Sequence, residues 1–208
     1  MPRNRDPFGL ALESLRTRAQ DGAFAPGQPI VIMEEARRLK LSTTPVREAL
    51  AWLCGEGMIE RGPGSGYVFP KLDAGLVRDR LEFRLYCLMA SLSLTTGLYH
   101  PDRSGSLGPV RATDVLGLFG QLVRRTANAS LVGAFDRVGG QLRRVTDVES
   151  RVFDDVDAEA STIIKMEAEK ANGTLARAIE TYHRRRMDNA ALLVLEIERQ
   201  ASIISSEA

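Results

Sequence analysis

The sequence is poor in the residues that build disulfides, metal sites and catalytic sites. Its 208 residues include two cysteines and two histidines. Cys54 and Cys87 are too isolated for a disulfide framework or a zinc site, and free thiols suit a reducing cytoplasm. Two histidines supply little acid–base chemistry, and we find no Ser/His/Asp set, phosphate loop or supported pair of acids. We therefore expect a cytoplasmic protein that is not an enzyme and uses no cofactor.

Long apolar runs and a strong charge imbalance are also missing. No stretch approaches the roughly 18 apolar residues of a membrane span, and the basic N-terminus lacks the apolar centre of a signal peptide. The formal net charge is +1, so bulk charge predicts no nucleic-acid partner and a DNA argument must rest on particular positions. Hydrophobic residues at 44% and charged residues at 26% fit one or two ordinary folded domains.

The first third of the chain changes from helical to strand periodicity. A first helix is expected to follow an Asp6 cap, with Pro7 at its first position, and to end by Gly22. The elements expected after it are helices over 31–39 and Thr43–Cys54 and strands over Met58–Glu60 and Gly66–Phe69. This order is typical of a winged helix-turn-helix. A helix pair with a turn also occurs in proteins that never bind DNA, so the wing is the more specific signal.

A proline lies close to the start of the third helix, in the stretch LSTTPVREAL. Proline is tolerated in the first helical turn, where the backbone N–H groups have no partner inside the helix. Either Ser42 is the cap and Pro45 the third helical residue, or Thr44 is the cap and Pro45 the first. The restriction on the residue before proline favours Thr44, but both alternatives stay open.

Polar side chains gather at this helix start. Val46, Leu50 and Leu53 form the stripe that we expect to be buried. The residues left outside it are Ser42, Thr43, Thr44 and Arg47. Arginine is the commonest reader of guanine in the major groove, hydroxyl groups suit phosphates or bases, and a helix start favours phosphate. The pattern predicts a DNA-reading surface with Arg47 as the main base reader.

Three motifs follow one another between residues 22 and 68: GAFAPG, LSTTPVREALAWLCGEGMI and GSGYV. With them, residues 6–70 closely resemble the winged-helix domain of the GntR family of bacterial transcription regulators. The resemblance implies that the third helix start reads the major groove and that the wing tip, Ser65–Gly66, reaches the minor groove. The implied contacts are Ser42, Thr43, Thr44, Arg47 and Gly66. Relatives often have a basic residue at Thr43 and an aliphatic one at Glu35, so we expect a different recognised sequence and different packing of the second helix.

In the remaining two thirds of the chain, the residue pattern predicts only helices. Apolar residues recur at helical spacing over about 74–97, 111–126, 129–152, 157–171 and 173–201, with a loop over 99–109. This pattern indicates a bundle of about five helices, with a weak spot at Gly139–Gly140. The expected fold is mostly α, with an N-terminal winged helix-turn-helix and a C-terminal all-α helical bundle. The expected boundaries are 6–70 for the first domain, 71–77 for the linker and 78–204 for the bundle.

The bundle resembles, less strongly, the ligand-sensing domain of the FadR-like (FCD) branch of the GntR family. The motifs that carry this resemblance are RLEFR (80–84), ANASL (127–131) and ARAIETYHRRR (176–186). Many such domains hold a metal through an Asp and three His. His183 falls at the last ligand position and Asp114 lies close to the Asp position, but Phe119 and Ala160 fall where the other histidines are expected. His100 matches none of them, so we expect no metal.

Arg84, His183 and Arg186 are the candidate effector-binding residues. Arg186 lies on the apolar stripe of the last helix, and a buried arginine needs an anionic partner. With Arg84 it could hold a carboxylate effector. The alternative is that residues 184–186 face solvent or meet acids such as Glu82, and that His183 is a hydrogen-bonded core histidine.

The sequence thus predicts a transcription regulator. The expected partners are a double-stranded DNA operator with an inverted repeat, a second copy of the chain bound through the bundle, and a small-molecule effector, with no membrane partner. The alternative is a constitutive repressor or a protein-interaction module whose sensor domain is degenerate and binds no ligand.

Overall fold

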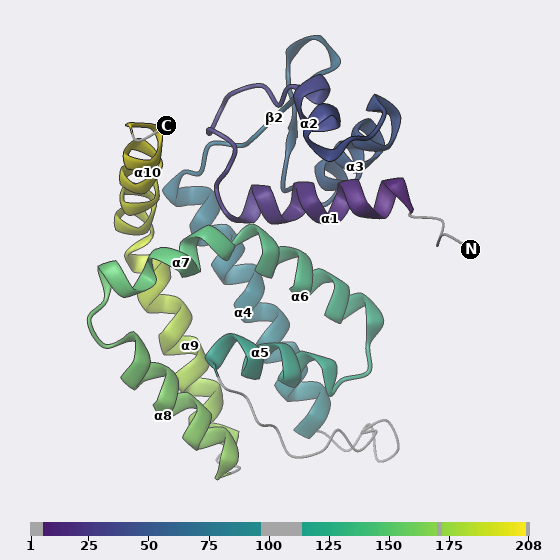
Figure 1. Cartoon of the computed structure of the whole chain (residues 1–208). Coiled ribbons are helices and arrows are strands. Elements are labelled where there is room, and N and C mark those ends of the chain that lie inside the picture. The colour runs from purple at the N-terminus through teal and green to yellow at the C-terminus, as the bar shows by residue number, and fades with distance from the viewer. Residues whose placement is uncertain (1–5, 97–113, 170–171, 207–208) are drawn as a thin grey trace. The chain divides into compact units, whose positions relative to one another are not determined.

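A computed structural model describes residues 6–96, 114–169 and 172–206. These ranges hold ten α-helices, one short 3-10 helix and one two-stranded hairpin (Figure 1). The prediction of a mostly α chain with a small hairpin is confirmed. The chain divides into two compact units at Leu72 and Asp73, and the last helix crosses the division again after Gln200. His100 and the predicted loop over 99–109 lie outside the described residues. None of the described helices is both long and apolar enough to cross a bilayer.

Unit 1 is a winged helix-turn-helix. Its elements are α1 (Pro7–Gln20), α2 (Ile32–Leu39), α3 (Thr43–Gly55), β1 (Glu60–Arg61), η1 (Pro63–Ser65) and β2 (Tyr67–Val68). The Asp6 side chain caps α1 by accepting a hydrogen bond from the Phe8 N–H at 3.1 Å, as predicted. The two strands pair antiparallel, with Glu60 opposite Val68. Leu15, Leu50 and Leu53 are fully buried between α1 and α3, which fixes how α3 is held.

The start of α3 decides between the two capping alternatives. Ser42 is the cap residue with extended backbone, and Pro45 is the third residue of the helix. The interpretation that favoured Thr44 as the cap is therefore wrong. The N–H of a third helical residue has no intrahelical acceptor, so proline there loses no hydrogen bond, and Thr44 is helical in spite of the proline that follows it.

The second helix carries a buried acid where the family resemblance implies an aliphatic side chain. Glu35 is 6% exposed and forms ion pairs with Arg18 of α1 at 3.2 Å and with Arg38 of its own helix at 2.8 Å. The Arg38 guanidinium also donates to the Ser14 hydroxyl at 2.9 Å. The second helix is therefore joined to α1 by buried charge as well as by apolar contact.

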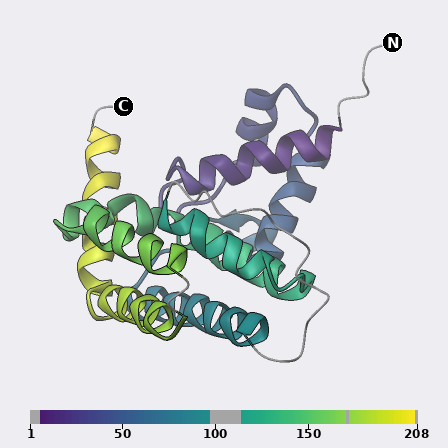
Figure 2. The ribbon, with the colours of Figure 1, turned by 90° about the horizontal axis from the view of Figure 1, so that it is seen from below.

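Unit 2 consists of helices alone. They are α4 (Ala74–Thr96), α5 (Val115–Arg124), α6 (Ala129–Gln141), α7 (Arg143–Val152), α8 (Val156–Ala168), α9 (Asn172–Asp188) and α10 (Ala190–Ser206), whose last residues belong to unit 1. The central α4 packs against α5, α6 and α9, and Figure 2 shows α4 and α9 side by side. Their shared core contains Leu88, Phe119, Ile179 and Tyr182.

Two of the predicted helices are each broken in two, so the described bundle has seven helices where about five were expected. The first break falls at Leu142, whose N–H reaches the carbonyls of both Val138 and Gly139 at 3.0 and 3.2 Å. The preceding glycines weaken the helix there. The second break falls at Asn189, whose side-chain amide donates to the Arg185 carbonyl at 2.8 Å and so competes with the backbone ladder.

The turn between α2 and α3 contains a strained residue. Lys40 has φ 56° and ψ 42°, and the Leu41 N–H closes the turn on the Ala36 carbonyl at 3.0 Å. A side chain in this left-handed conformation costs about 1 kcal/mol relative to glycine. The strained Lys40 lies in the turn that sets the angle between the two helices.

Lys40→Gly is expected to raise the free energy of unfolding of unit 1 by about 1 kcal/mol, because glycine adopts a positive φ without steric penalty. Trp52 is the single tryptophan and lies on α3, so its fluorescence during urea unfolding reports on this unit. The matched control is Arg37→Gly, inside α2, which is expected to lose about 1 kcal/mol. A lower stability of Lys40→Gly than of the parent chain would contradict the assignment of strain.

Candidate DNA-binding surface and the polar core of the bundle

The start of α3 presents polar side chains to solvent. Ser42, Thr44 and Arg47 are exposed, while Thr43 is half-buried. The Ser42 side chain makes no capping hydrogen bond. Among the described residues, no hydrogen bond or ion pair holds the Arg47 guanidinium. The helix start therefore offers N–H groups, hydroxyl groups and an unpaired cation to an anionic partner.

This exposure follows from the buried stripe of α3. Val46, Leu50 and Leu53 are fully buried in the core of unit 1. In an α-helix, residues three or four apart share a face, so burying these three turns Arg47 outward, one position beyond Val46. The apolar packing of α3 on α1 thus fixes where the candidate DNA-reading side chains lie.

The wing is a tight hairpin with a basic residue at its base. Gly64 has φ 67°, and the Gly62 N–H donates to the Gly66 carbonyl at 3.0 Å. Gly66 is half-exposed. Arg61 is exposed, and its guanidinium carbon lies 4.8 Å from the centroid of the buried Tyr67 ring. Arg61 was not among the residues predicted from the sequence, although its place directly before the wing turn was a signal for it.

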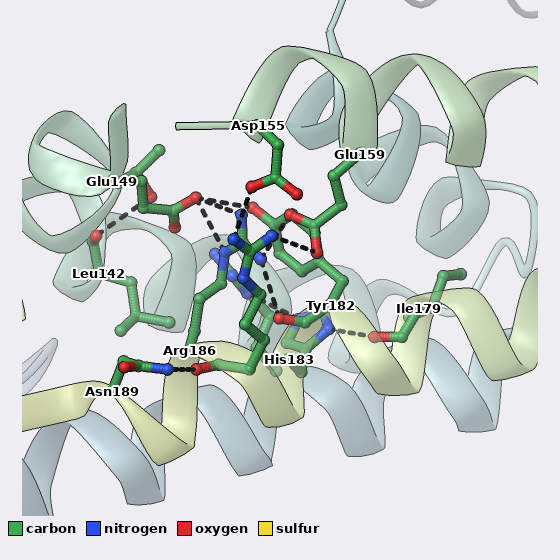
Figure 3. A network of polar contacts seen from close by, with 12 residues as sticks. Leu142, Glu149, Asp155, Glu159, Ile179, Tyr182, His183, Arg186 and Asn189 are labelled. Atoms are coloured by element: carbon green, nitrogen blue, oxygen red, sulfur yellow. Dashed lines mark hydrogen bonds and ion pairs between the residues drawn. The ribbon is translucent and has the colours of Figure 1, made fainter. Parts of the chain in front are cut away.

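The second cluster is the polar core of the bundle, which contains a fully buried arginine. Arg186 of α9 has no exposed surface. Figure 3 shows its side chain between those of Glu149 and Glu159. Its Nε and Nη2 donate to one oxygen of Glu149 at 2.8 and 2.7 Å, and its Nη1 lies 2.9 Å from Glu159. The Nη1 also donates to the Tyr182 carbonyl at 2.9 Å. Its charge is therefore balanced by acids from α7 and α8.

Aromatic rings enclose this ion pair. The guanidinium carbon of Arg186 lies 3.2 Å from the centroid of the Tyr182 ring and 5.4 Å from that of Phe153. The Tyr182 hydroxyl donates to Glu149 at 3.2 Å. Burial, followed by the negative charge of Glu149, raises the pKa of Tyr182 to about 12, so the phenol stays protonated as a donor.

Arg84 and His183 form the other half of the polar core. The Arg84 Nε donates to the His183 Nε2 at 3.1 Å, and the His183 Nδ1 lies 2.8 Å from the Ile179 carbonyl. Because a guanidinium has no acceptor, Nε2 must carry the lone pair and Nδ1 the proton. Burial, then the nearby Arg84 charge, lowers the pKa of His183 well below its usual value. The histidine is neutral in the folded chain.

The two buried arginines differ in their partners. Burial lowers the pKa of Arg84, which has no ion pair with a carboxylate among the described residues and whose Nη2 has no hydrogen-bond acceptor. Burial is also the largest single effect on Arg186, but the hydrogen bond to Glu149 and the electrostatic interactions with Tyr182, Glu149 and Glu159 together outweigh it, and the pKa of Arg186 is raised. Removing Glu149 would take away the two hydrogen bonds from Arg186 to a carboxylate and leave only its ion pair with Glu159, which costs up to about 3–5 kcal/mol.

The residues at this place do not fit the metal site of FCD domains. A histidine binds a metal through a lone pair, and the free lone pair of His183 is directed at Arg84. Phe119 stacks against His183 with ring centroids 5.5 Å apart, and Ala160 has no donor atom. Asp114 caps α5 by accepting from the Gly117 N–H at 2.6 Å. Within the described ranges, no three His, Cys, Asp or Glu side chains form a metal-binding group.

The structure brings together the three candidate effector residues and adds acids that the sequence analysis missed. Arg84, His183 and Arg186 share one buried cluster. The expectation that residues 184–186 face solvent or meet acids is correct. The exposed Arg184 pairs with Glu180 at 2.6 Å, and Arg185 and Arg186 pair with Asp155 and Glu149. Glu82 was the wrong acid, because it accepts from Tyr86. The core histidine interpretation of His183 is confirmed by its burial and hydrogen bonds.

Comparison with known proteins identifies the class to which this fold belongs. Residues 11–69 match the family described as bacterial regulatory proteins, gntR family. A stretch of 71 residues is 35% identical to the Nta operon transcriptional regulator of Aminobacter aminovorans, and it covers 34% of each chain. The match thus spans about a third of that relative's length. The likeness to the gntR family thus covers the winged helix-turn-helix of unit 1.

Solved structures resemble the whole chain in fold. A structure described as E. coli McbR/YncC aligns with a TM-score of 0.64 at 11% identity, over 89% of this chain and 97% of that one. A transcriptional regulator GntR from Rhodococcus sp. RHA1 aligns with a TM-score of 0.66 at 15% identity, over 88% and 96% of the two chains. At these identities the likeness shows the fold alone. It extends beyond the winged helix into the bundle.

The lowered pKa of His183 predicts a pH dependence of stability. The unfolded chain binds a proton near the ordinary histidine pKa, whereas the folded chain does not, so the free energy of unfolding should fall as the pH falls below about 6.5. The slope from one such group is at most about 1.4 kcal/mol per pH unit.

His183→Gln should flatten this dependence between about pH 7 and 5.5, since the amide oxygen can still accept from Arg84 but does not titrate. Urea unfolding followed by far-ultraviolet circular dichroism measures the slope. Equal slopes in the two chains would show that His183 does not take up a proton on unfolding.

Proposed function

We propose that the chain is a sequence-specific DNA-binding transcription regulator that works in the cytoplasm and is not an enzyme. The observation that carries the proposal is the exposed Arg47, without a protein partner among the described residues, at the start of a helix whose other face is buried. A helix of this kind enters the major groove with its first turns against base edges. The match of residues 11–69 to the gntR family supports the same assignment.

Each proposed DNA contact has a chemical role. Arg47 reads guanine through O6 and N7. Ser42, Thr43 and Thr44 hold phosphates or nearby bases through their hydroxyl groups and the helix N-terminus. At the tip of the wing, Ser65–Gly66 reaches the minor groove, as the family resemblance implies. Arg61 adds a phosphate contact at the base of the wing, where it is exposed.

We further propose that two copies of the chain pair through their bundles and bind an inverted repeat. A closed dimer has twofold symmetry, and the operator of such a protein mirrors that symmetry in its two half-sites. The whole-chain likeness in fold to the Rhodococcus protein supports a bundle of the same general kind, and the FCD branch is the assignment that the motifs of α4, α6 and α9 favour.

For the sensor function of the bundle there are two candidates. One is a small-molecule effector, such as an organic acid, bound by Arg84, His183 and Arg186. The other is a regulator whose bundle needs no ligand. The ion pairs of Arg186 favour the second, because Glu149 and Glu159 already neutralise the charge that would attract an acid. We therefore propose that the bundle serves assembly and does not depend on an organic acid.

Arg47→Ala is expected to remove sequence discrimination worth about 1–3 kcal/mol per half-site, because the bidentate contact to guanine is lost. Fluorescence anisotropy on an operator selected by the parent chain, compared with an unrelated duplex, gives the discrimination. Arg177→Ala, which removes an exposed arginine from the bundle, is the matched control and should leave it unchanged. An unaltered operator footprint with Arg47→Ala would refute the assignment.

Arg61→Ala is expected to weaken binding to all duplexes evenly, since phosphate contacts carry no sequence information. The slope of log K against log salt concentration should become less steep by about one per protomer. A loss of discrimination with an unchanged salt slope would mean that Arg61 reads bases and not phosphate.

A further inference from the structure

The polar core of the bundle has the composition of an anion site, but its anion is part of the chain. Arg186 and the Tyr182 hydroxyl converge on one carboxylate, with donor–acceptor distances of 2.7 to 3.2 Å. Both side chains are buried, as is Glu149 at 3% exposure. Three hydrogen bonds from a guanidinium and a phenol are the contacts by which proteins recognise a carboxylate ligand.

The carboxylate of Glu149 is held in a constrained way. All three donors meet the same oxygen, Oε2, while Oε1 is buried and has no hydrogen-bond donor among the described residues. An arginine ordinarily meets a carboxylate side-on, with one donor to each oxygen. The position of Glu149 on α7 fixes how its carboxylate approaches Arg186. A free carboxylate of the same size has no such tether and can turn to offer both oxygens.

A second cation without a carboxylate contact lies in the same cluster. Arg84 is 2% exposed, its Nε donates to His183, and no described residue accepts a hydrogen bond from its Nη2. It also takes the histidine lone pair that a metal would need. The positive charge of this core is thus supplied by two guanidinium groups, and the only carboxylates that pair with it among the described residues are those of Glu149 and Glu159.

We propose that Glu149 is a built-in carboxylate ligand that fills an anion site formed by Arg186 and Tyr182, and so closes this site to external acids. The site's chemical class is that of a small monocarboxylate. The proposal deepens the ligand-independent alternative above and therefore rests on the proposed role of the bundle. It does not depend on the DNA-binding assignment of unit 1.

The test is to remove the carboxylate of Glu149 by substitution and to supply a carboxylate from solution in its place. Glu149→Ala removes Cγ, Cδ and both carboxylate oxygens, and acetate replaces these four heavy atoms as a free molecule. In chloride, the full-length variant is expected to lose on the order of 10 °C in Tm, because Arg186 loses both hydrogen bonds to Glu149 and keeps only its ion pair with Glu159. With a Kd of about 10 mM, 0.3 M sodium acetate should restore on the order of 5 °C relative to sodium chloride of equal ionic strength.

Three controls separate binding at this site from general salt effects. Acetamide has the shape of acetate without its charge and should not restore the Tm. Glu149→Ala combined with Arg186→Met removes both charges, and should be more stable than Glu149→Ala in chloride and indifferent to acetate. Glu149→Gln keeps the site filled, so acetate should not stabilise it. The parent chain should show the same Tm in acetate and chloride.

The Tm values measured in acetate and in chloride test the proposal independently of DNA binding. Acetate stabilisation confined to Glu149→Ala supports it, as does recovery of folded protein by acetate alone if the variant does not fold in chloride. An equal acetate effect on the parent chain and Glu149→Ala would overturn it. Failure of acetate to restore Glu149→Ala, folded or not, would also overturn it. Operator binding by the parent chain, measured separately, would be untouched by either negative result and tests the proposed function by itself.

Discussion

The interaction on which the bundle depends is the buried ion pair of Arg186 with Glu149. A guanidinium without exposed surface has to find its counter-charge inside the chain, and α7 and α8 must be placed so that Glu149 and Glu159 reach it. Tyr182 joins the same carboxylate and is held as a protonated donor by its raised pKa. The order of helices around α9 is therefore set by charge as well as by apolar packing.

The two units use arginine in opposite ways. In unit 1, Arg47 stands on the exposed face of α3, and no described residue partners it. In unit 2, Arg186 is enclosed by aromatic rings and bound by acids of its own chain. An exposed, unpaired guanidinium keeps its donors for a partner molecule, whereas a buried and neutralised one holds a core together. The contrast explains why we assign recognition to the first unit and structure to the second.

Local sequence signals predicted the winged helix well because caps, turns and short-range periodicity act locally. Asp6 and Pro7 start α1 as expected, and the stripe of Val46, Leu50 and Leu53 turns Arg47 outward. Before the break at Leu142 the sequence predicted a weak spot at Gly139–Gly140, whereas the break at Asn189 could not be predicted, since the apolar stripe continues through it. Glu149 was missed because it lies 37 residues from Arg186, and only the packing of α7 on α9 brings them together. The candidate effector residues were correctly grouped, but their internal acids were not foreseen.

The most direct test of the account is the affinity of the parent chain for its selected operator, measured at constant ionic strength in chloride and in a panel of small carboxylates. Anisotropy titrations give the Kd in each salt. We predict tight, sequence-dependent binding whose Kd changes by less than about twofold between chloride and any carboxylate, because Glu149 already holds the anion position. A carboxylate that changed the Kd by about tenfold or more, while also raising the Tm of the parent chain, would contradict a bundle that supplies its own ligand.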